Sequence, residues 1–308
     1  MNVRVTGQTQ TANAIAYQQK GFSILAKYQD QIASGLRVKL PSDDPGRFPA
    51  LADAKTASQR YAAYVQNMTD ATTDLNAGVD ALQETNNVLV RAKQIAIEGA
   101  DGVANAQGHE ALAQEVDALI ERALKAGNSQ QDGKYLFGGT GTDRPPFSVS
   151  ATDASGRPAT ISYGGTADRS RALIAPGKTM DTKYAGNAVF QQAGTDVFAA
   201  LIGLRDDLRG AAASGNAAPV AARLAEVDAA RDAIGTVTAE QASSLAALEA
   251  LRNRTGDLKL ASEIRTSELS ATDYAEAIVR MQEQQNSLEA TLAISARIMQ
   301  PNLLSFIG

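Results

Sequence analysis

Apolar residues recur at heptad spacing near both ends of the 308-residue chain. In each end segment, one series of apolar residues is spaced in steps of three and four, and polar residues occupy the remaining positions of the series. These predicted seam residues are Ile15, Phe22, Leu25, Ile32 and Leu36 in the first segment, and Tyr274, Ile278, Met281, Leu288 and Leu292 in the last. Such steps hold one stripe of a helix against a partner helix, which is the coiled-coil pattern. Both ends are therefore predicted to be helices that assemble through these seams.

A break follows the first helical segment. Residues 40–46 read Leu-Pro-Ser-Asp-Asp-Pro-Gly, in which Asp44 suits a helix N-cap and Pro45 the first helical position, although Pro49 could move that start by a few residues. We expect Ser42, Asp43, Asp44 and Pro45 to form a hinge that lets the terminal segment dock at its own angle.

Two long stretches between the ends favour helical rods. Residues 50–98 contain no proline and one glycine, and apolar periodicity resumes from Val220 to about Ile264. Shorter helices are predicted at about residues 110–126 and 197–208. Two rods of similar length on either side of an insertion can return alongside each other as an antiparallel pair.

The insertion between the rods has a different texture. Residues 138–194 are dense in Gly, Thr, Ser, Asp and Pro, and residues 160–163 and 171–174 alternate like half-buried strands. The predicted fold is mainly α, a long antiparallel helical hairpin or coiled-coil bundle from both chain ends with a small inserted β domain. Three parts are expected. Residues 1–44 with 270–308 form a terminal coiled-coil segment that is disordered in the monomer. Residues 45–137 with 195–269 form the rod domain, and residues 138–194 form the inserted β domain.

Composition narrows the function. The chain has no Cys, one His and 5% aromatic residues, and alanine makes up nearly a fifth of it. Thiolate metal sites, a Cys nucleophile and multi-histidine sites are thereby excluded. A net charge of −5 disfavours nucleic acid as a partner. We expect no enzyme activity and no cofactor.

Candidate chemistry along the chain is weak. Residues 137–141, Phe-Gly-Gly-Thr-Gly, lack the Gly-Lys-Ser/Thr of a phosphate-binding loop and are better explained as a turn into β structure. Asp43 and Asp44 are neighbours without acid–base geometry, and His109 is expected at the surface or in a helix cap. No run approaches the ~18–20 apolar residues of a membrane-spanning helix, and the first residues lack the apolar region of a cleavable secretory signal. These absences fit a cytosolic protein, or one exported without such a signal.

Several short motifs carry a family resemblance. They include residues 31–37 (Gln-Ile-Ala-Ser-Gly-Leu-Arg), 41–45 (Pro-Ser-Asp-Asp-Pro), 134–140 (Lys-Tyr-Leu-Phe-Gly-Gly-Thr) and 163–165 (Tyr-Gly-Gly), with an amphipathic end at residues 291–308. Together and in this order they resemble the flagellin superfamily, and the Pro-Ser-Asp-Asp-Pro version is similar to its hook–filament junction branch, the hook-associated protein 3 family. Two departures are the Gly46–Pro49 segment, in place of an Ala-rich stretch, and Pro301 just before the terminal Leu-Leu, where the helix should end or kink.

The resemblance implies a structural subunit of the bacterial flagellum, located outside the cell after unfolded export through the flagellar type III apparatus. It also implies a homo-oligomeric ring between neighbouring hook-associated protein and flagellin subunits, and an export chaperone on the C-terminal segment. Two alternatives stay open: a flagellin-type filament subunit, and, in a different class, a secreted helical adhesin or translocator.

Overall fold

The computed structural model describes residues 7–101 and 105–299, with side chains from Ala12 to Ala296 apart from residues 102–104. The expectations for Pro301 and the terminal Leu-Leu lie outside these residues. Within them the chain forms seven helices, four of which are longer than 25 residues. In chain order they are α1 (Gly7–Ser34), α2 (Phe48–Ala100), α3 (Ala106–Gly127), α4 (Gly186–Phe190), α5 (Val197–Ser214), α6 (Ala218–Ser270) and α7 (Tyr274–Met299).

The chain divides into two compact units. The terminal unit comprises Met1–Arg60 with Leu258–Gly308, and the bundle unit comprises Tyr61–Asp257. Both cuts fall inside the long helices α2 and α6, so each unit contains part of both. The three-part division expected from the sequence stays a prediction.

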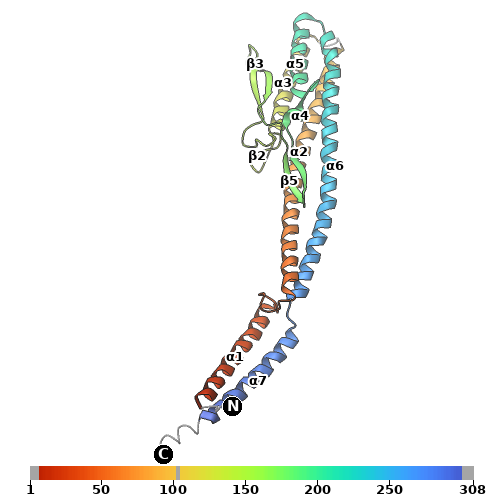
Figure 1. The fold of residues 1–308 in the computed structure, drawn as a ribbon. Helices are drawn as coiled ribbons and strands as arrows, with labels where there is room; N and C mark the ends of the chain where they lie inside the picture. The colour runs from red at the N-terminus through yellow and green to blue at the C-terminus, as the bar shows by residue number, and fades with distance from the viewer. Residues whose placement is uncertain (1–6, 102–104, 300–308) are drawn as a thin grey trace, which may run out of the picture. The chain divides into compact units, whose positions relative to one another are not determined.

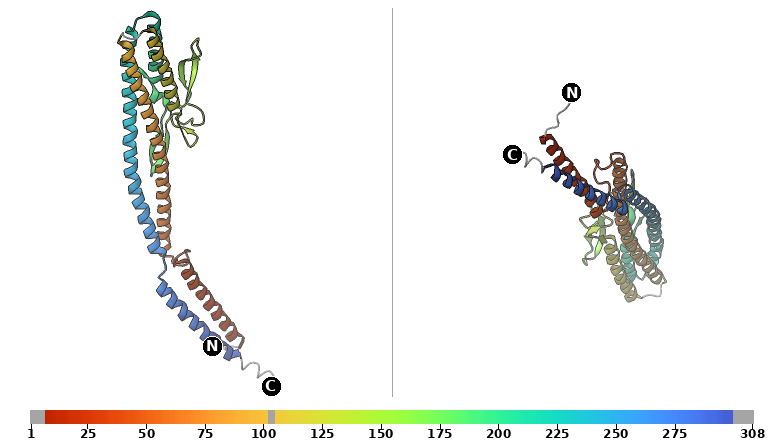
Figure 2. Two further views of the ribbon diagram at one scale, coloured as in Figure 1. Left: turned by 180° about the vertical axis from the view of Figure 1, so that it is seen from behind. Right: turned by 90° about the horizontal axis from the view of Figure 1, so that it is seen from below.

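In the terminal unit, α1 and α7 lie side by side and antiparallel (Figure 1, Figure 2). The close approach of Gly21 to Leu288, and of Gly35 to Tyr274, fixes their direction. A small apolar cluster lies beside them, in which Val38, Leu51 and Leu269 are buried. This unit has little apolar core of its own.

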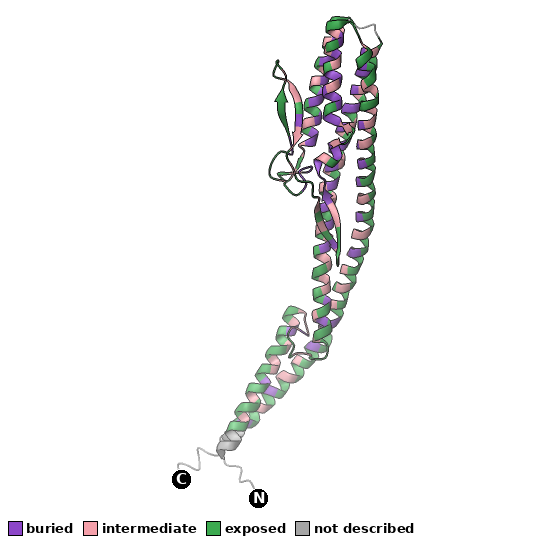
Figure 3. Ribbon diagram, turned by 45° about the horizontal axis from the view of Figure 1, so that its top comes forward, coloured by how far each residue is buried: buried purple, intermediate pink, exposed green. Residues whose placement is uncertain are grey.

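The bundle unit packs α3 and α5 against α2 and α6 around one continuous core. Buried residues line the facing sides of the long helices (Figure 3). Asn105 caps α3 by accepting a hydrogen bond from the Gly108 N–H at 2.8 Å, and Asp196 caps α5 by accepting one from Ala199 at 2.9 Å. Each cap satisfies a backbone donor that the first helical turn cannot pair internally, so each fixes where its helix begins.

Four antiparallel strand pairs lie between α3 and α5 in the chain. They are β1 (Gln130–Gln131) with β2 (Lys134–Tyr135), β3 (Phe147–Thr152) with β4 (Pro158–Tyr163), β5 (Ser170–Ala175) with β6 (Lys178–Lys183), and β7 (Gln191–Gln192) with β8 (Thr195–Asp196). The β1–β2 turn places Asp132 and Gly133 at positive φ, which an Asp-Gly pair adopts readily. A cluster of four phenylalanines, Phe137, Phe147, Phe190 and Phe198, packs β3 and α4 against α5.

The predicted fold class is confirmed: the protein is mainly helical, with long antiparallel helices and a small region of short strands. Both predicted strands are present within β4 and β5. The rods extend beyond their predicted ends, and α2 begins at Phe48 with Pro49 inside its first turn. No helix in the two described ranges is both long and apolar enough to cross a bilayer.

Candidate functional site

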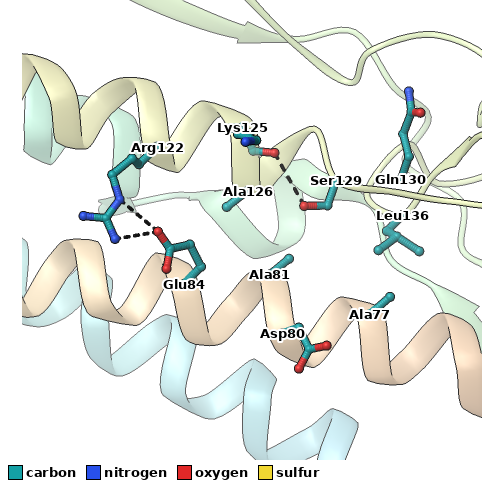
Figure 4. Close-up of a pocket in the computed structure, with 10 residues that line it drawn as sticks. All are labelled: Ala77, Asp80, Ala81, Glu84, Arg122, Lys125, Ala126, Ser129, Gln130 and Leu136. Carbon is teal, nitrogen blue, oxygen red and sulfur yellow. Dashed lines mark hydrogen bonds and ion pairs between the residues drawn. The ribbon is translucent and has the colours of Figure 1, made fainter.

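A surface hollow between α2 and α3 offers no catalytic arrangement. It lies at the end of α3 and has a volume of about 520 Å³, with Ala77 and Ala81 on its floor. Arg122 and Glu84 pair across it at 2.6 Å, and the Ser129 hydroxyl donates to the Lys125 carbonyl (Figure 4). Paired charges on an open surface stabilise the fold and activate no nucleophile. No group of three or more His, Cys, Asp or Glu side chains in the described chain is placed to hold a metal ion.

The helix pair α1–α7 is the more informative region because it contains the predicted assembly seam. Its facing sides are made largely of small and polar residues, which are buried or half-buried. They are Ala14, Gln18, Gly21, Leu25, Tyr28 and Ile32 on α1, and Ala277, Met281, Gln284, Leu288, Thr291 and Ser295 on α7. Four predicted seam residues, Leu25, Ile32, Met281 and Leu288, therefore lie within this contact.

The other predicted seam residues lie outside it. The exposed fractions are 48% for Ile15, 53% for Phe22, 53% for Tyr274, 41% for Ile278 and 40% for Leu292. We call these five residues the terminal apolar face. The sequence pattern selected the most apolar stripe of each helix, whereas the two helices pack through a neighbouring stripe of smaller side chains.

Helix geometry places the terminal apolar face on one flank of the pair. Each residue advances a helix by about 100°, so Ile15 and Phe22 lie to the same side of the α1 seam, as do Ile278 and Leu292 for α7. In an antiparallel pair these two flanks form one surface. The opposite flank is a groove of about 600 Å³ with charged walls, including Lys27, Arg37, Glu276 and Arg280.

Leu36, the last predicted seam residue of the first segment, lies beyond the end of α1. Its backbone forms an isolated antiparallel bridge with Ala271. The residue before it, Gly35, has φ +71°, which ends the helix. Leu36 is thus half-buried in the connection between helices and takes no part in the α1–α7 seam.

The predicted hinge forms an ordered series of turns. Asp43 accepts hydrogen bonds from the Lys39 and Leu40 N–H groups, each at 3.0 Å, and pairs with Lys27 at 3.3 Å. The two backbone donors, first Leu40 and then Lys39, hold the pKa of the Asp43 carboxyl below its usual value. Ser42 lies in the same turn.

Asp44 and Pro45 open the approach to α2. The Asp44 carboxylate accepts from the Arg47 N–H at 3.0 Å, and its carbonyl accepts from Phe48 at 2.9 Å. Asp44 therefore caps a turn with Pro45 just inside it, and that turn leads into α2. Whether these four residues act as a hinge stays a prediction.

His109 corrects an expectation from the sequence. It is buried, with 4% of its surface exposed, rather than at the surface. Its ring nitrogens lie 3.2 Å from the Asn105 carbonyl oxygen and 3.0 Å from that of Gly99. The side chain thus joins the end of α2 to the start of α3, and both of its partners are backbone.

A buried charge cluster in the bundle was not expected from the sequence. Arg205 is fully buried and donates to the Pro158 carbonyl of β4 at 2.6 Å, while contacting Asp117 of α3 at 3.4 Å. Asp117 also pairs with Arg209 and with Arg157. The cluster ties the β3–β4 hairpin to α3 and α5. Its signal in the sequence is the change in α5 from the apolar run that ends at Leu204 to the charged residues Arg205, Asp206, Asp207 and Arg209.

Comparisons with known proteins agree with this architecture. Residues 5–142 match the bacterial flagellin N-terminal helical region. The flagellar hook-associated protein 3 of Escherichia coli (strain K12) is 25% identical over 280 residues, covering 86% of this chain and 87% of that protein. A flagellar hook-associated protein from Vibrio parahaemolyticus has a similar fold, with a TM-score of 0.65 at 21% identity over 74% of this chain and 100% of that one.

The family match covers the N-terminal helices and the entry into the strands, and the Escherichia coli protein aligns with most of the chain. The motifs at residues 31–37, 41–45 and 134–140 fall within the matched N-terminal region. The chain is therefore similar to the bacterial flagellin N-terminal helical region over its first helices, and to flagellar hook-associated protein 3 over 86% of its length.

Proposed function

We propose that the protein is a structural subunit of the bacterial flagellum that forms the junction between hook and filament. Its copies assemble as a ring between neighbouring hook-associated protein and flagellin subunits. Its role is mechanical, and it catalyses no reaction. The observation that carries the proposal is the terminal apolar face, together with the similarity of the chain to flagellar hook-associated protein 3.

The terminal apolar face suits contact between subunits because the helix pair leaves it uncovered. Five large side chains, each at least 40% exposed, gather on one flank of two helices. Exposed apolar patches on otherwise polar proteins mark interaction sites, and a helix laid on this flank would bury them all. The ends also differ in charge. Residues 1–36 carry three basic side chains and one acidic, whereas residues 272–308 carry two basic and four acidic, which favours α1 beside α7.

Export and location follow from the same proposal. The subunit would leave the cell unfolded through the flagellar type III apparatus, with a chaperone holding the C-terminal segment, and would function outside the cell. A chain without cysteine suits this route because no thiol can cross-link in transit.

Deletion of the gene tests the proposal directly. Cells without the protein should retain hooks, lack filaments and shed flagellin into the medium, as seen by electron microscopy and by immunoblotting of the medium. Normal filaments would contradict the junction role. Hooks with full filaments but lost attachment to surfaces would favour the adhesin alternative instead.

A pair of charge substitutions on α7 tests the surface. Leu292→Asp should abolish filament growth in complemented cells, because it places a charge in the buried interface between subunits. Ile294→Asp is the matched control: Ile294 is 58% exposed and, two residues away, points about 200° from Leu292 around the same turn. Both proteins should be secreted equally. If the two strains swam equally well, the terminal apolar face would not be the surface through which subunits assemble.

A further inference from the structure

Helices α6 and α7 are interrupted for three residues, 271–273, yet their packed sides lie on one line. The less exposed positions are residues 259, 262, 266, 269 and 270 in the last turns of α6, and 277, 281, 284, 285 and 288 in the first turns of α7. Steps of three and four lead from residue 259 to 270, residue 277 follows after seven, and steps of four and three then lead to residue 288. Such steps follow one side of a single helix. The interruption therefore leaves the packed side where a continuous helix would place it.

The sequence contains no strong helix breaker at this interruption. Neither Gly nor Pro occurs in residues 257–299, although these two residues commonly end helices. Ala271 is itself a strong helix former. The local signal is Asp273, whose carboxylate accepts from the Ala275 N–H at 2.9 Å and from the Glu276 N–H at 3.2 Å. Asp273 thereby caps the start of a separate α7.

The other cause of the interruption is contact with the segment that follows α1. The Ser270 carbonyl accepts from the Arg37 N–H at 2.6 Å, and the Thr272 N–H donates to the Gly35 carbonyl at 2.9 Å. These two bonds flank the antiparallel bridge described above. We call these contacts, between residues 35–38 and 270–273, the clasp. Residues 271 and 272 are held out of the helix by a segment distant in the chain.

The bonds of the clasp replace bonds that a continuous helix would make. In such a helix the Thr272 N–H would donate to the Glu268 carbonyl, and the Ser270 carbonyl would accept from the Tyr274 N–H. The clasp gives the Thr272 N–H and the Ser270 carbonyl other partners, whereas the N–H groups of Asp273 and Tyr274 donate to no acceptor in the part of the chain that the structure describes. A continuous helix would pair both. Joining α6 to α7 also needs no new helix nucleus, because both helices already exist.

We propose that the clasp is a two-state joint. When residues 35–38 are bound, α6 and α7 are separate helices; when they are released, residues 271–273 become helical and α6 and α7 form one rod. Because the packed side is continuous across the interruption, Ala277, Met281 and Leu288 keep their side of the helix in both states. Release therefore stiffens the connection without changing the residues that can face α1. The joint is a property of the chain alone and does not depend on the proposed junction role.

Amide hydrogen exchange at single-residue resolution in the purified full chain tests the joint. Arg37→Pro removes the N–H that donates to Ser270, and Leu36 before it lies in a β-bridge, an extended conformation that suits the residue preceding a proline. The amides of Asp273 and Tyr274 should then exchange about tenfold more slowly than in the natural chain, because they gain helical acceptors.

Arg37→Ala is the matched control. It removes the same side chain but keeps the N–H, so both amides should exchange as in the natural chain. A terminal unit that Arg37→Pro merely destabilised would show faster exchange of the two amides, the opposite of the expected result. Faster or unchanged exchange in Arg37→Pro would overturn the proposal.

A second variant shifts the joint from the other side and leaves residues 35–38 as they are. Asp273→Ala removes the cap of a separate α7 and places the strongest helix former within the interruption. The Tyr274 amide should again exchange about tenfold more slowly than in the natural chain. If its exchange were unchanged or faster, α7 would not join α6 when its cap is lost, and the two-state joint would be wrong.

Discussion

Arg205 illustrates how one buried side chain can hold the strands to the helices. Its side chain is 1% exposed, and its guanidinium contacts Asp117 of α3, Asp206 of α5 and the Pro158 carbonyl of β4. Burial of a guanidinium is tolerated only when its charge is paired and its donors are bound. The three contacts meet that condition and come from three different elements.

Loss of the Asp117 carboxylate should destabilise the bundle. Asp117→Asn leaves Arg205 and Arg209 with less negative charge beside them, and we expect the free energy of unfolding in urea to fall by about 3 kcal/mol. Asp206→Asn is the control, since Asp206 is 56% exposed and water can replace much of its contribution, with an expected loss below about 1 kcal/mol. Equal effects of the two substitutions would show that the buried contact is not the dominant one.

Asp43 should give the terminal unit a dependence on pH. Backbone N–H donors from Leu40 and Lys39 lower the pKa of its carboxyl from the usual 3.8. A carboxyl whose pKa is lower in the folded state stabilises that state above pH 3.8, and the contribution is lost as the pH falls through the folded value. Asp43→Asn should therefore be less stable than the natural chain at pH 7, with the difference shrinking below pH 3.8. A gap that is constant with pH in thermal unfolding would contradict this assignment.

At the scale of elements, α2 and α6 are held by a seam in which a few polar residues interrupt the apolar series. Thr85 and Gln241 are both buried there. The Thr85 hydroxyl donates to the Ala81 carbonyl at 2.9 Å, whereas the Gln241 Oε1, close to Gly78, has no hydrogen-bond partner in the described chain. The two residues are alike in burial and differ in whether their polar atoms are satisfied.

Replacement of Gln241 should therefore stabilise the rod. Gln241→Leu keeps the side-chain volume similar and removes a buried acceptor without a donor, so we expect a gain of about 1 kcal/mol in the free energy of unfolding. Thr85→Val removes a satisfied hydroxyl and should give no gain. Urea denaturation of both variants measures the difference. A loss of stability in Gln241→Leu would show that the amide has a partner or a role in register.

The sequence predicted the helices better than their contacts. The rods could be found because proline and glycine are nearly absent from residues 50–98 and apolar residues recur within them. The α1–α7 seam could not, because Gly21 and Gln284 carry no apolar signal and become interior only when the helices approach closely. Arg205 was missed for a related reason, because it is buried by partners distant in the chain, Asp117 and the Pro158 carbonyl. The burial of His109 depends on how the end of α2 meets the start of α3, which apolar periodicity does not report. The strand β6, Lys-Thr-Met-Asp-Thr-Lys, likewise lacks the alternation that identified β4 and β5.

At the scale of the whole molecule, the two units differ in how they are stabilised. The bundle unit buries a continuous apolar core from five helices and three of the strands, including the phenylalanine cluster. The terminal unit has a cluster around Val38, Leu51 and Leu269, and a helix seam built from small and polar side chains. Helices in water are stabilised chiefly by packing of an apolar face, and here the most apolar flank is left uncovered. The terminal helices are thus the part of the chain that gains most from contact with other subunits.

Amide hydrogen exchange should be fast in α1 and α7 of the purified chain and should slow when the subunits assemble. In the purified full chain, amides of α1 and α7 should exchange far faster than those of α3 and α5, because opening the terminal pair exposes little apolar surface. In isolated flagella the same amides should become protected as the terminal apolar face is buried, while α3 and α5 change little. Mass spectrometry of peptides from the four helices provides the comparison within one sample. If α1 and α7 were as protected as α3 in the purified chain, the terminal helices would be stable without neighbours, and their ordering on assembly would have to be abandoned.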